Sequence, residues 1–183
     1  MPFPKTWVEE LVVEWLQLEG YLVVANLPVS VPKAGGRNEV DIVGARVENN
    51  ELKIMHIETG LRASKPDDTL NMLNRKFSDA VCQKVEAYFK ERFGWTDDRG
   101  TINYQKFYIA TYFPETHRNV FKEAGVELEH VSDFICERVL PAIQIWQENP
   151  PHQPRYPGES VTLPESYWLL KLIESLRDRL QNK

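Results

Sequence analysis

The chain has 183 residues and a net charge of −5, with 42% hydrophobic and 27% charged residues. These values are ordinary for one globular domain with a real core and a few peripheral elements. No apolar run approaches the ~18 residues that span a membrane. The N-terminal MPFPKTWVEE lacks the apolar segment of a signal peptide, so we expect a cytoplasmic protein without a membrane partner. The negative net charge argues against a surface that grips DNA over its whole area, but it leaves room for a local basic patch.

The first element is predicted to be a helix. Thr6 with Glu9 three residues later fits a capping box, and apolar residues recur at helical spacing as far as Leu18. At about 100° per residue, Glu9 falls at the border of the apolar face. It is therefore either a half-buried acid with a further role or simply the second member of the capping box. Residues 21–29, YLVVANLPV, then predict a first strand.

Two apolar-rich runs lie between Asn38 and Gly60, in NEVDIVGARVENNELKIMHIETG, and the turn signal Glu-Asn-Asn separates them. They predict a hairpin of two strands, with side chains alternating between faces. Asp41 interrupts the first run and Glu58 lies at the end of the second, so the two carboxylates converge if the runs pair. Converging carboxylates repel unless a cation lies between them. Mg²⁺ binds through one or two carboxylates together with water and substrate phosphate.

The rest of the chain alternates helices and strands. The predicted elements are a long helix from Asp67 or Asp68 to Phe93, a strand from Tyr104 to Phe113, a short helix from His117 to Ala124, a strand from Val126 to Val131, and a helix from Ser132 or Asp133 that Pro141 kinks or divides. We therefore predict one α/β domain over residues 1–148 and a proline-rich linker or arm over residues 149–163. Residues 164–183 are predicted to form a C-terminal helix that packs on the core or on a partner.

The order of helix, three strands, long helix and strand, with acids on the first helix and on the second and third strands, resembles the PD-(D/E)XK nuclease superfamily. This is the fold of restriction endonucleases and archaeal Holliday-junction resolvases. The resemblance covers about residues 6–113. It implies a restriction-endonuclease-like αβββαβ core, a mixed central sheet flanked by helices, with additional C-terminal helices. The helix acid of the family matches Glu9, the strand aspartate matches Asp41 in VDIVG, and the glutamate of E-x-K matches Glu58 in HIETG.

The resemblance implies metal-assisted hydrolysis of DNA phosphodiesters, with Glu9, Asp41 and Glu58 as the catalytic acids. Asp41, Glu58 and the backbone carbonyl of Thr59 would hold Mg²⁺ or Mn²⁺, and Glu9 would bind through water or complete a second site. The metal would polarise the phosphate and lower the pKa of the attacking water. Because many nucleases of this fold dimerise, the C-terminal helix is also a candidate homodimer interface by analogy.

One departure from the family pattern affects the chemistry. The family's lysine lies two residues after the glutamate, where this chain has Gly60. A glycine can neither orient water nor stabilise the charge that develops on the phosphorane. The candidate substitute cations are Arg62 beyond the strand, Arg75 and Lys76 on the long helix, and His56 on the same strand face as Glu58.

Three interpretations of these features remain open. The first is a Mg²⁺-dependent DNA endonuclease, which the three acids favour. The second is a catalytically degenerate nuclease-fold domain that binds nucleic acid or a protein partner, which the missing lysine and the negative charge favour. The third is a generic α/β domain whose acids are a cap, an edge-strand charge and a turn residue. The sequence contains no phosphate loop, nucleophile elbow, zincin motif or dinucleotide fingerprint.

Overall fold

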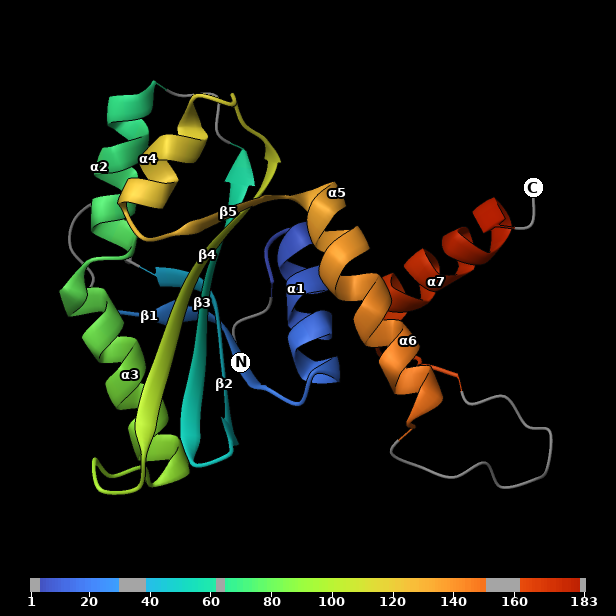
Figure 1. Cartoon of the computed structure of the whole chain (residues 1–183), viewed down its shortest axis with the longest axis horizontal. Helices are drawn as coiled ribbons and strands as arrows, with labels where there is room; N and C mark the ends of the chain where they lie inside the picture. The colour runs from blue at the N-terminus through green and yellow to red at the C-terminus, as the bar shows by residue number, and fades with distance from the viewer. Residues whose placement is uncertain (1–3, 30–38, 62–64, 151–161, 182–183) are drawn as a thin grey trace.

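A computed structural model gives the chain a five-stranded mixed sheet with helices on both faces (Figure 1). The structure describes residues 4–29, 39–61, 65–150 and 162–181. The strands, in their order across the sheet, are β1 (Leu22–Pro28), β2 (Glu39–Glu48), β3 (Glu51–Leu61), β4 (Thr101–Tyr112) and β5 (Glu127–His130). The first three strands form an antiparallel meander, and β4 and β5 each run parallel to the preceding strand. The predicted α/β class with a mixed sheet between helices is confirmed.

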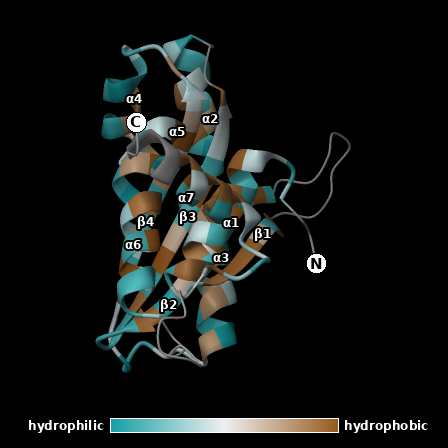
Figure 2. Ribbon diagram, turned by 90° about the vertical axis from the view of Figure 1, so that its right-hand side faces the viewer, coloured by the Kyte–Doolittle hydropathy of each residue, from teal (hydrophilic) through white to brown (hydrophobic). Residues whose placement is uncertain are grey.

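The helices form two layers, one on each face of the sheet. The helices are α1 (Trp7–Leu18), α2 (Pro66–Lys76), α3 (Asp79–Phe93), α4 (His117–Glu123), α5 (Val131–Phe134), α6 (Leu140–Glu148) and α7 (Trp168–Gln181). Helices α2, α3 and α4 cover one face of the sheet, and α1, α5, α6 and α7 cover the other (Figure 1). Hydrophobic residues dominate the strands, whereas the helices alternate between hydrophobic and hydrophilic stretches (Figure 2). Each helix therefore buries one stripe against the sheet.

The β2–β3 hairpin follows from its turn. Asn49 and Asn50 both have positive φ, 49° and 63°, and asparagine is one of the residues that tolerates this conformation. Alternation then sends Ile42 and Ile57 to the α1 face, where they join the core around that helix. Side chains of the opposite parity face α2 and α3. This parity places three polar side chains of the hairpin on the α2 and α3 face, namely Asp41, His56 and Glu58.

The prediction of one long helix from Asp67 or Asp68 to Phe93 is wrong, because the structure has two helices there, α2 and α3. Helix α2 begins with Pro66 and ends at Lys76, and Ser78 has the extended backbone of a cap residue before α3. The intervening Phe77 is buried, and its ring centroid lies 4.5 Å from that of His56. The apolar spacing of three and four continues across this break, so periodicity alone does not reveal it. Tertiary burial of Phe77 decides where the helix ends.

The C-terminal helices differ from expectation only in detail. Helical backbone continues from Val131 to Glu148 through Pro141: α5 leads into a π-helical turn over Ile135–Val139, and α6 follows with the proline in its first turn. Proline has no N–H to donate to the preceding turn, which explains the wider turn before it. Helix α7 begins at Trp168, slightly later than the expected Pro164-Glu165, and most of the proline-rich segment, residues 151–161, lies outside the described residues.

Helix α7 packs on the core of this chain. Leu169 and Leu170 are buried in the same cluster as the apolar face of α1 and the inner side of α6. Of the two positions that the sequence left open for this helix, the structure shows the one on the core. No helix among the described residues is long and apolar enough to cross a membrane.

Candidate active site

Two acids of the hairpin meet where β2 and β3 lie side by side. Each of the two carboxylates accepts a hydrogen bond from the backbone of the other strand. The N–H of Asp41 on β2 donates to Glu58 Oε1 at 3.4 Å, and the N–H of Thr59 on β3 donates to Asp41 Oδ2 at 3.0 Å. Each carboxylate is therefore held by the neighbouring strand. The antiparallel pairing of β2 with β3 produces the convergence that the sequence predicted for these two residues.

A lysine from the adjacent helix lies between the two acids. Lys76, the last residue of α2, places its Nζ atom 2.6 Å from Glu58 Oε2, 3.5 Å from Asp41 Oδ1 and 2.8 Å from the carbonyl oxygen of Glu39. Both carboxylate oxygens contact one ammonium group, so they are much closer together than the ~8 Å beyond which they could not share a metal ion. Three oxygens from two strands thus surround one positively charged atom.

Burial sets the electrostatics of this cluster. Only 2% of the Glu58 side chain is exposed, against 22% of Asp41 and 19% of Lys76. Burial raises the pKa of Glu58, and the nearby Lys76 partly offsets that rise. The pKa of Asp41 is also raised, first by burial and then by the charge of Glu58. At both acids the cost of burying a charged carboxylate outweighs the favourable effect of Lys76 on the pKa.

His56 extends the cluster into the protein interior. It is fully buried, its Nε2 lies 3.4 Å from Glu58 Oε1, and its Nδ1 lies 2.8 Å from the hydroxyl of Tyr104 on β4. Burial lowers the pKa of His56 to about 3, with Lys76 and Lys106 acting in the same direction. The imidazole is therefore neutral at pH 7. It orients Glu58 and does not supply the missing positive charge.

Glu9 and Arg75 differ from Lys76 in their contacts. Glu9 is buried, but its carboxylate contacts the backbone N–H of Lys5 at 2.6 Å and the hydroxyl of Thr6 at 3.4 Å, which is a local capping arrangement at the start of α1. Within the described parts of the chain, the hydrogen bonds of the Glu9 side chain go to Lys5 and Thr6 and not to Asp41 or Glu58. Arg75 is exposed on α2, and Arg62 lies outside the described residues. Of the four candidate cations, the structure brings Lys76 to the two acids as a charged partner.

The backbone at Gly60 disfavours a lysine two residues after Glu58 on β3. Gly60 has φ of +146°, which side-chain-bearing residues rarely adopt, and an added Cβ would lie 2.9 Å from the hydroxyl of the buried Tyr108. A lysine there would strain the backbone and collide with Tyr108. The positive charge instead comes from Lys76 at the end of α2, which the sequence offered only as one of several candidate cations.

The oxygens around Lys76 fit a divalent metal ion in their chemistry. Among residues 4–29, 39–61, 65–150 and 162–181, no group of three or more His, Cys, Asp or Glu side chains is arranged to hold a metal. Two carboxylates and a backbone carbonyl nevertheless surround a single cation, and such hard oxygen ligands suit Mg²⁺ or Mn²⁺. The backbone carbonyl at the cation belongs to Glu39, whereas Thr59 contributes its N–H to Asp41. The sequence analysis did not predict that the Glu39 carbonyl lies at the site. Its position two residues before Asp41, on the same side of the strand, could have indicated this.

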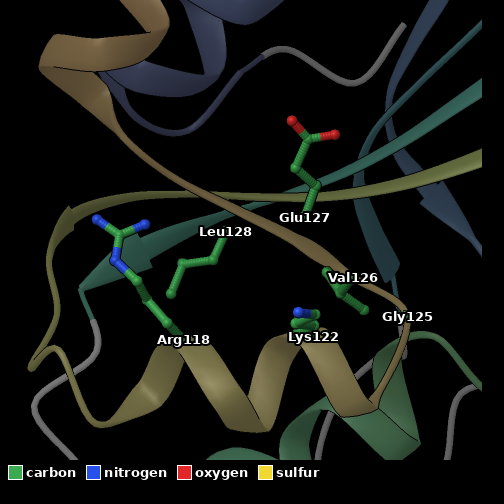
Figure 3. Close-up of a pocket in the computed structure, with 6 residues that line it drawn as sticks. All are labelled: Arg118, Lys122, Gly125, Val126, Glu127 and Leu128. Carbon is green, nitrogen blue, oxygen red and sulfur yellow. The ribbon is translucent and has the colours of Figure 1, made fainter.

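A separate pocket of about 370 Å³ lies between α4 and β5 (Figure 3). Arg118 and Lys122 project from α4 on one side of it, and the residues from Gly125 to Leu128 form the other side. The guanidinium of Arg118 is 5.0 Å from the centre of the Phe113 ring and pairs with Glu115. This pocket shares no lining residue with the acidic cluster, so it is a distinct surface feature.

No family model, curated protein or solved structure gives a significant match to this chain. Function therefore has to be inferred from the chemistry of the site, since a general α/β class is compatible with many activities. The cluster of Asp41, Glu58 and Lys76, supported by His56, is the most distinctive polar arrangement in the described residues.

Proposed function

We propose that this protein is a Mg²⁺- or Mn²⁺-dependent DNA endonuclease with a restriction-endonuclease-like fold. The observation that carries the proposal is the convergence of Asp41 and Glu58 on one cation position. The order of α1, three antiparallel strands, the helices α2 and α3, and a parallel β4 supports it, because this is the order expected of that fold. DNA as the substrate class rests on the resemblance of the motifs.

In the proposed reaction, Asp41 and Glu58 would hold the metal ion with the carbonyl of Glu39. Such a metal would supply Lewis-acid polarisation of the phosphate and a lowered pKa for the attacking water. Lys76 provides the positive charge near the phosphate that Gly60 does not provide. His56, kept neutral by burial, donates to Glu58 and keeps its carboxylate in position.

A second candidate function is a nuclease-fold domain without catalysis that binds nucleic acid or a protein partner. The ion pairs of Lys76 favour this alternative, because an ammonium already compensates part of the acidic charge without any metal. The local capping role of Glu9 points in the same direction, since it leaves two acids at the site in place of three.

A cleavage assay tests the proposal. Purified protein is incubated with plasmid and with single-stranded DNA in the presence of Mg²⁺ or Mn²⁺, next to the variants Glu58→Gln and Asp41→Asn. We expect each variant to lose about two orders of magnitude of activity or more, because each removes a charged group at the reacting centre. Glu51→Gln is the matched control, an acid on β3 at the opposite end from the site.

The outcomes separate the two candidate functions. Equal cleavage by the wild type and Glu58→Gln would identify a contaminating nuclease. Absence of cleavage together with salt-sensitive DNA binding would support the non-catalytic alternative, since phosphate contacts weaken as salt rises. Cleavage that requires metal and is lost in both site variants but kept in Glu51→Gln would establish the enzyme.

A further inference from the structure

The amino group of Lys76 lies where a metal ion would lie. Its three oxygen neighbours, from Glu39, Asp41 and Glu58, are the same oxygens that could bind a divalent cation. Mg²⁺ binds oxygen at about 2.0–2.1 Å, so a metal on these three oxygens would lie almost on top of the ammonium nitrogen. Two cations so close together repel strongly in a partly buried site. The pocket holds either the ammonium or the metal.

The surrounding structure allows the lysine side chain to leave without moving its helix. The backbone next to Lys76 is fixed, because Leu73 and Phe77 are buried and the Phe77 carbonyl accepts a hydrogen bond from Lys106 Nζ at 3.4 Å. The side chain itself is 19% exposed and has a long, flexible stem. Exchange therefore requires a rotation of one side chain.

We propose that Lys76 is a built-in competitor for the metal pocket: its ammonium fills the pocket when no metal is bound and leaves it when a divalent cation binds. This inference rests on the proposed function, because it concerns the same site. Two carboxylates face the single ammonium of Lys76, and a divalent ion would bring two positive charges to the same oxygens. The displaced ammonium stays tethered beside the acids, close to where a substrate phosphate would lie.

Competition and catalysis make opposite demands on the same residue. Removing the ammonium eliminates the competitor, so metal should bind more tightly to a Lys76 variant. The same change removes the charge proposed to act on the phosphate, so cleavage should fall. A lysine with only a structural role would not tighten metal binding when it is removed.

The test measures Mn²⁺ binding alone, without DNA, by isothermal titration calorimetry and by the electron paramagnetic resonance signal of free Mn²⁺. We expect Lys76→Met to bind Mn²⁺ at least about 10-fold more tightly than the wild type. Arg75→Met is the matched control, because Arg75 is the exposed neighbour on the same helix, and its affinity should equal that of the wild type.

A second measurement uses the wild-type protein, so it does not depend on whether a variant folds. Amine-reactive acylation followed by mass spectrometry reports the accessibility of each lysine. Acylation of Lys76 should rise several-fold on addition of Mg²⁺, whereas Lys53, which pairs with Glu48 on the hairpin, should not change.

The results distinguish failure of this inference from failure of the proposed function. Mn²⁺ binding of equal or weaker affinity in Lys76→Met, with unchanged acylation of Lys76, would overturn the exchange and leave the proposed nuclease intact. Absence of Mn²⁺ binding in both the wild type and Lys76→Met would overturn the metal site and the exchange together.

Discussion

At the scale of single residues, the buried His56 shows how the fold prepares the acidic pair. Its Nδ1 lies 2.8 Å from the Tyr104 hydroxyl, so a hydroxyl that donates to Nδ1 leaves the proton on Nε2, facing Glu58. Phe77 covers the ring from the side of α2. A neutral donor of this kind fixes the Glu58 carboxylate without adding charge to the cluster.

We expect the buried imidazole to make the protein sensitive to acid. The pKa of His56 is lowered from 6.5 to about 3. Below pH 6.5 the imidazole therefore binds a proton in the unfolded chain but stays neutral in the folded chain. The free energy of unfolding should therefore fall by about 1.4 kcal/mol per pH unit between roughly pH 6 and pH 4 from this group alone. Urea unfolding at a series of pH values measures this slope.

Two variants isolate the histidine from the carboxyl groups that also titrate in acid. His56→Gln removes the titrating ring, so its stability should depend less steeply on pH than that of the wild type. Tyr104→Phe keeps the imidazole buried and should keep the slope. Parallel pH profiles for the wild type and His56→Gln would contradict the assignment of a neutral, buried His56.

At this scale the sequence could predict the strand residues of the site but not the cation. Strand alternation places Asp41, His56 and Glu58 on one face, and the structure agrees. Lys76 was one of four candidates, because helical spacing does not reveal where α2 ends or how it lies against the sheet. The contacts of Lys76 with both acids exist only after β2, β3 and α2 have come together.

At the scale of elements, the ends of strands and helices are fixed by contacts between segments distant in sequence. The break between α2 and α3 is one example. The start of β4 is another: Gly100 has φ of +152°, and an added Cβ would overlap the carbonyl oxygen of Asn50 in the β2–β3 turn. The loop before β4 and the hairpin turn are therefore packed backbone against backbone, with no room for a side chain.

We expect Gly100→Ala to lower the free energy of unfolding by at least about 2–3 kcal/mol, because the substitution adds a steric overlap to the cost of an unfavourable φ. Thermal and urea unfolding measure the change. Gly125→Ala is the control: it also has positive φ, but open space surrounds its position, so it should cost only about 1 kcal/mol. Similar losses in the two variants would show that the turn and the loop are not tightly packed.

At the scale of the whole molecule, α7 is attached by an acid of the first helix. Glu14 on α1 is buried, and its carboxylate accepts hydrogen bonds from the backbone N–H groups of Leu169 at 3.4 Å and Leu170 at 3.0 Å. These N–H groups lie in the first turn of α7. N–H groups in the first turn of a helix have no carbonyl of the same helix to bind. The carboxylate of Glu14 thus caps a helix more than 150 residues away.

We expect Glu14→Gln to loosen α7 without unfolding the sheet. An amide cannot accept hydrogen bonds at both positions, so the loss should be about 1–3 kcal/mol. Hydrogen exchange should accelerate at the amides of Leu169 and Leu170 and stay unchanged in β3. The exposed Gln17 on the same helix provides the control variant Gln17→Ala, which should leave exchange in α7 unaltered. Equal protection of α7 in both variants would show that apolar packing alone holds this helix.

The sequence by itself determined most of the elements and their inward faces, because periodicity, capping residues and turn residues act over a few neighbours. It therefore predicted the α/β class, the start of α1 at Thr6 and the convergence of Asp41 and Glu58. Tertiary structure decided what surrounds those acids. The break after Lys76, the backbone at Gly60 and the local use of Glu9 depend on contacts between elements. Such contacts leave no periodic signal in the chain, since each joins residues whose spacing in sequence is arbitrary.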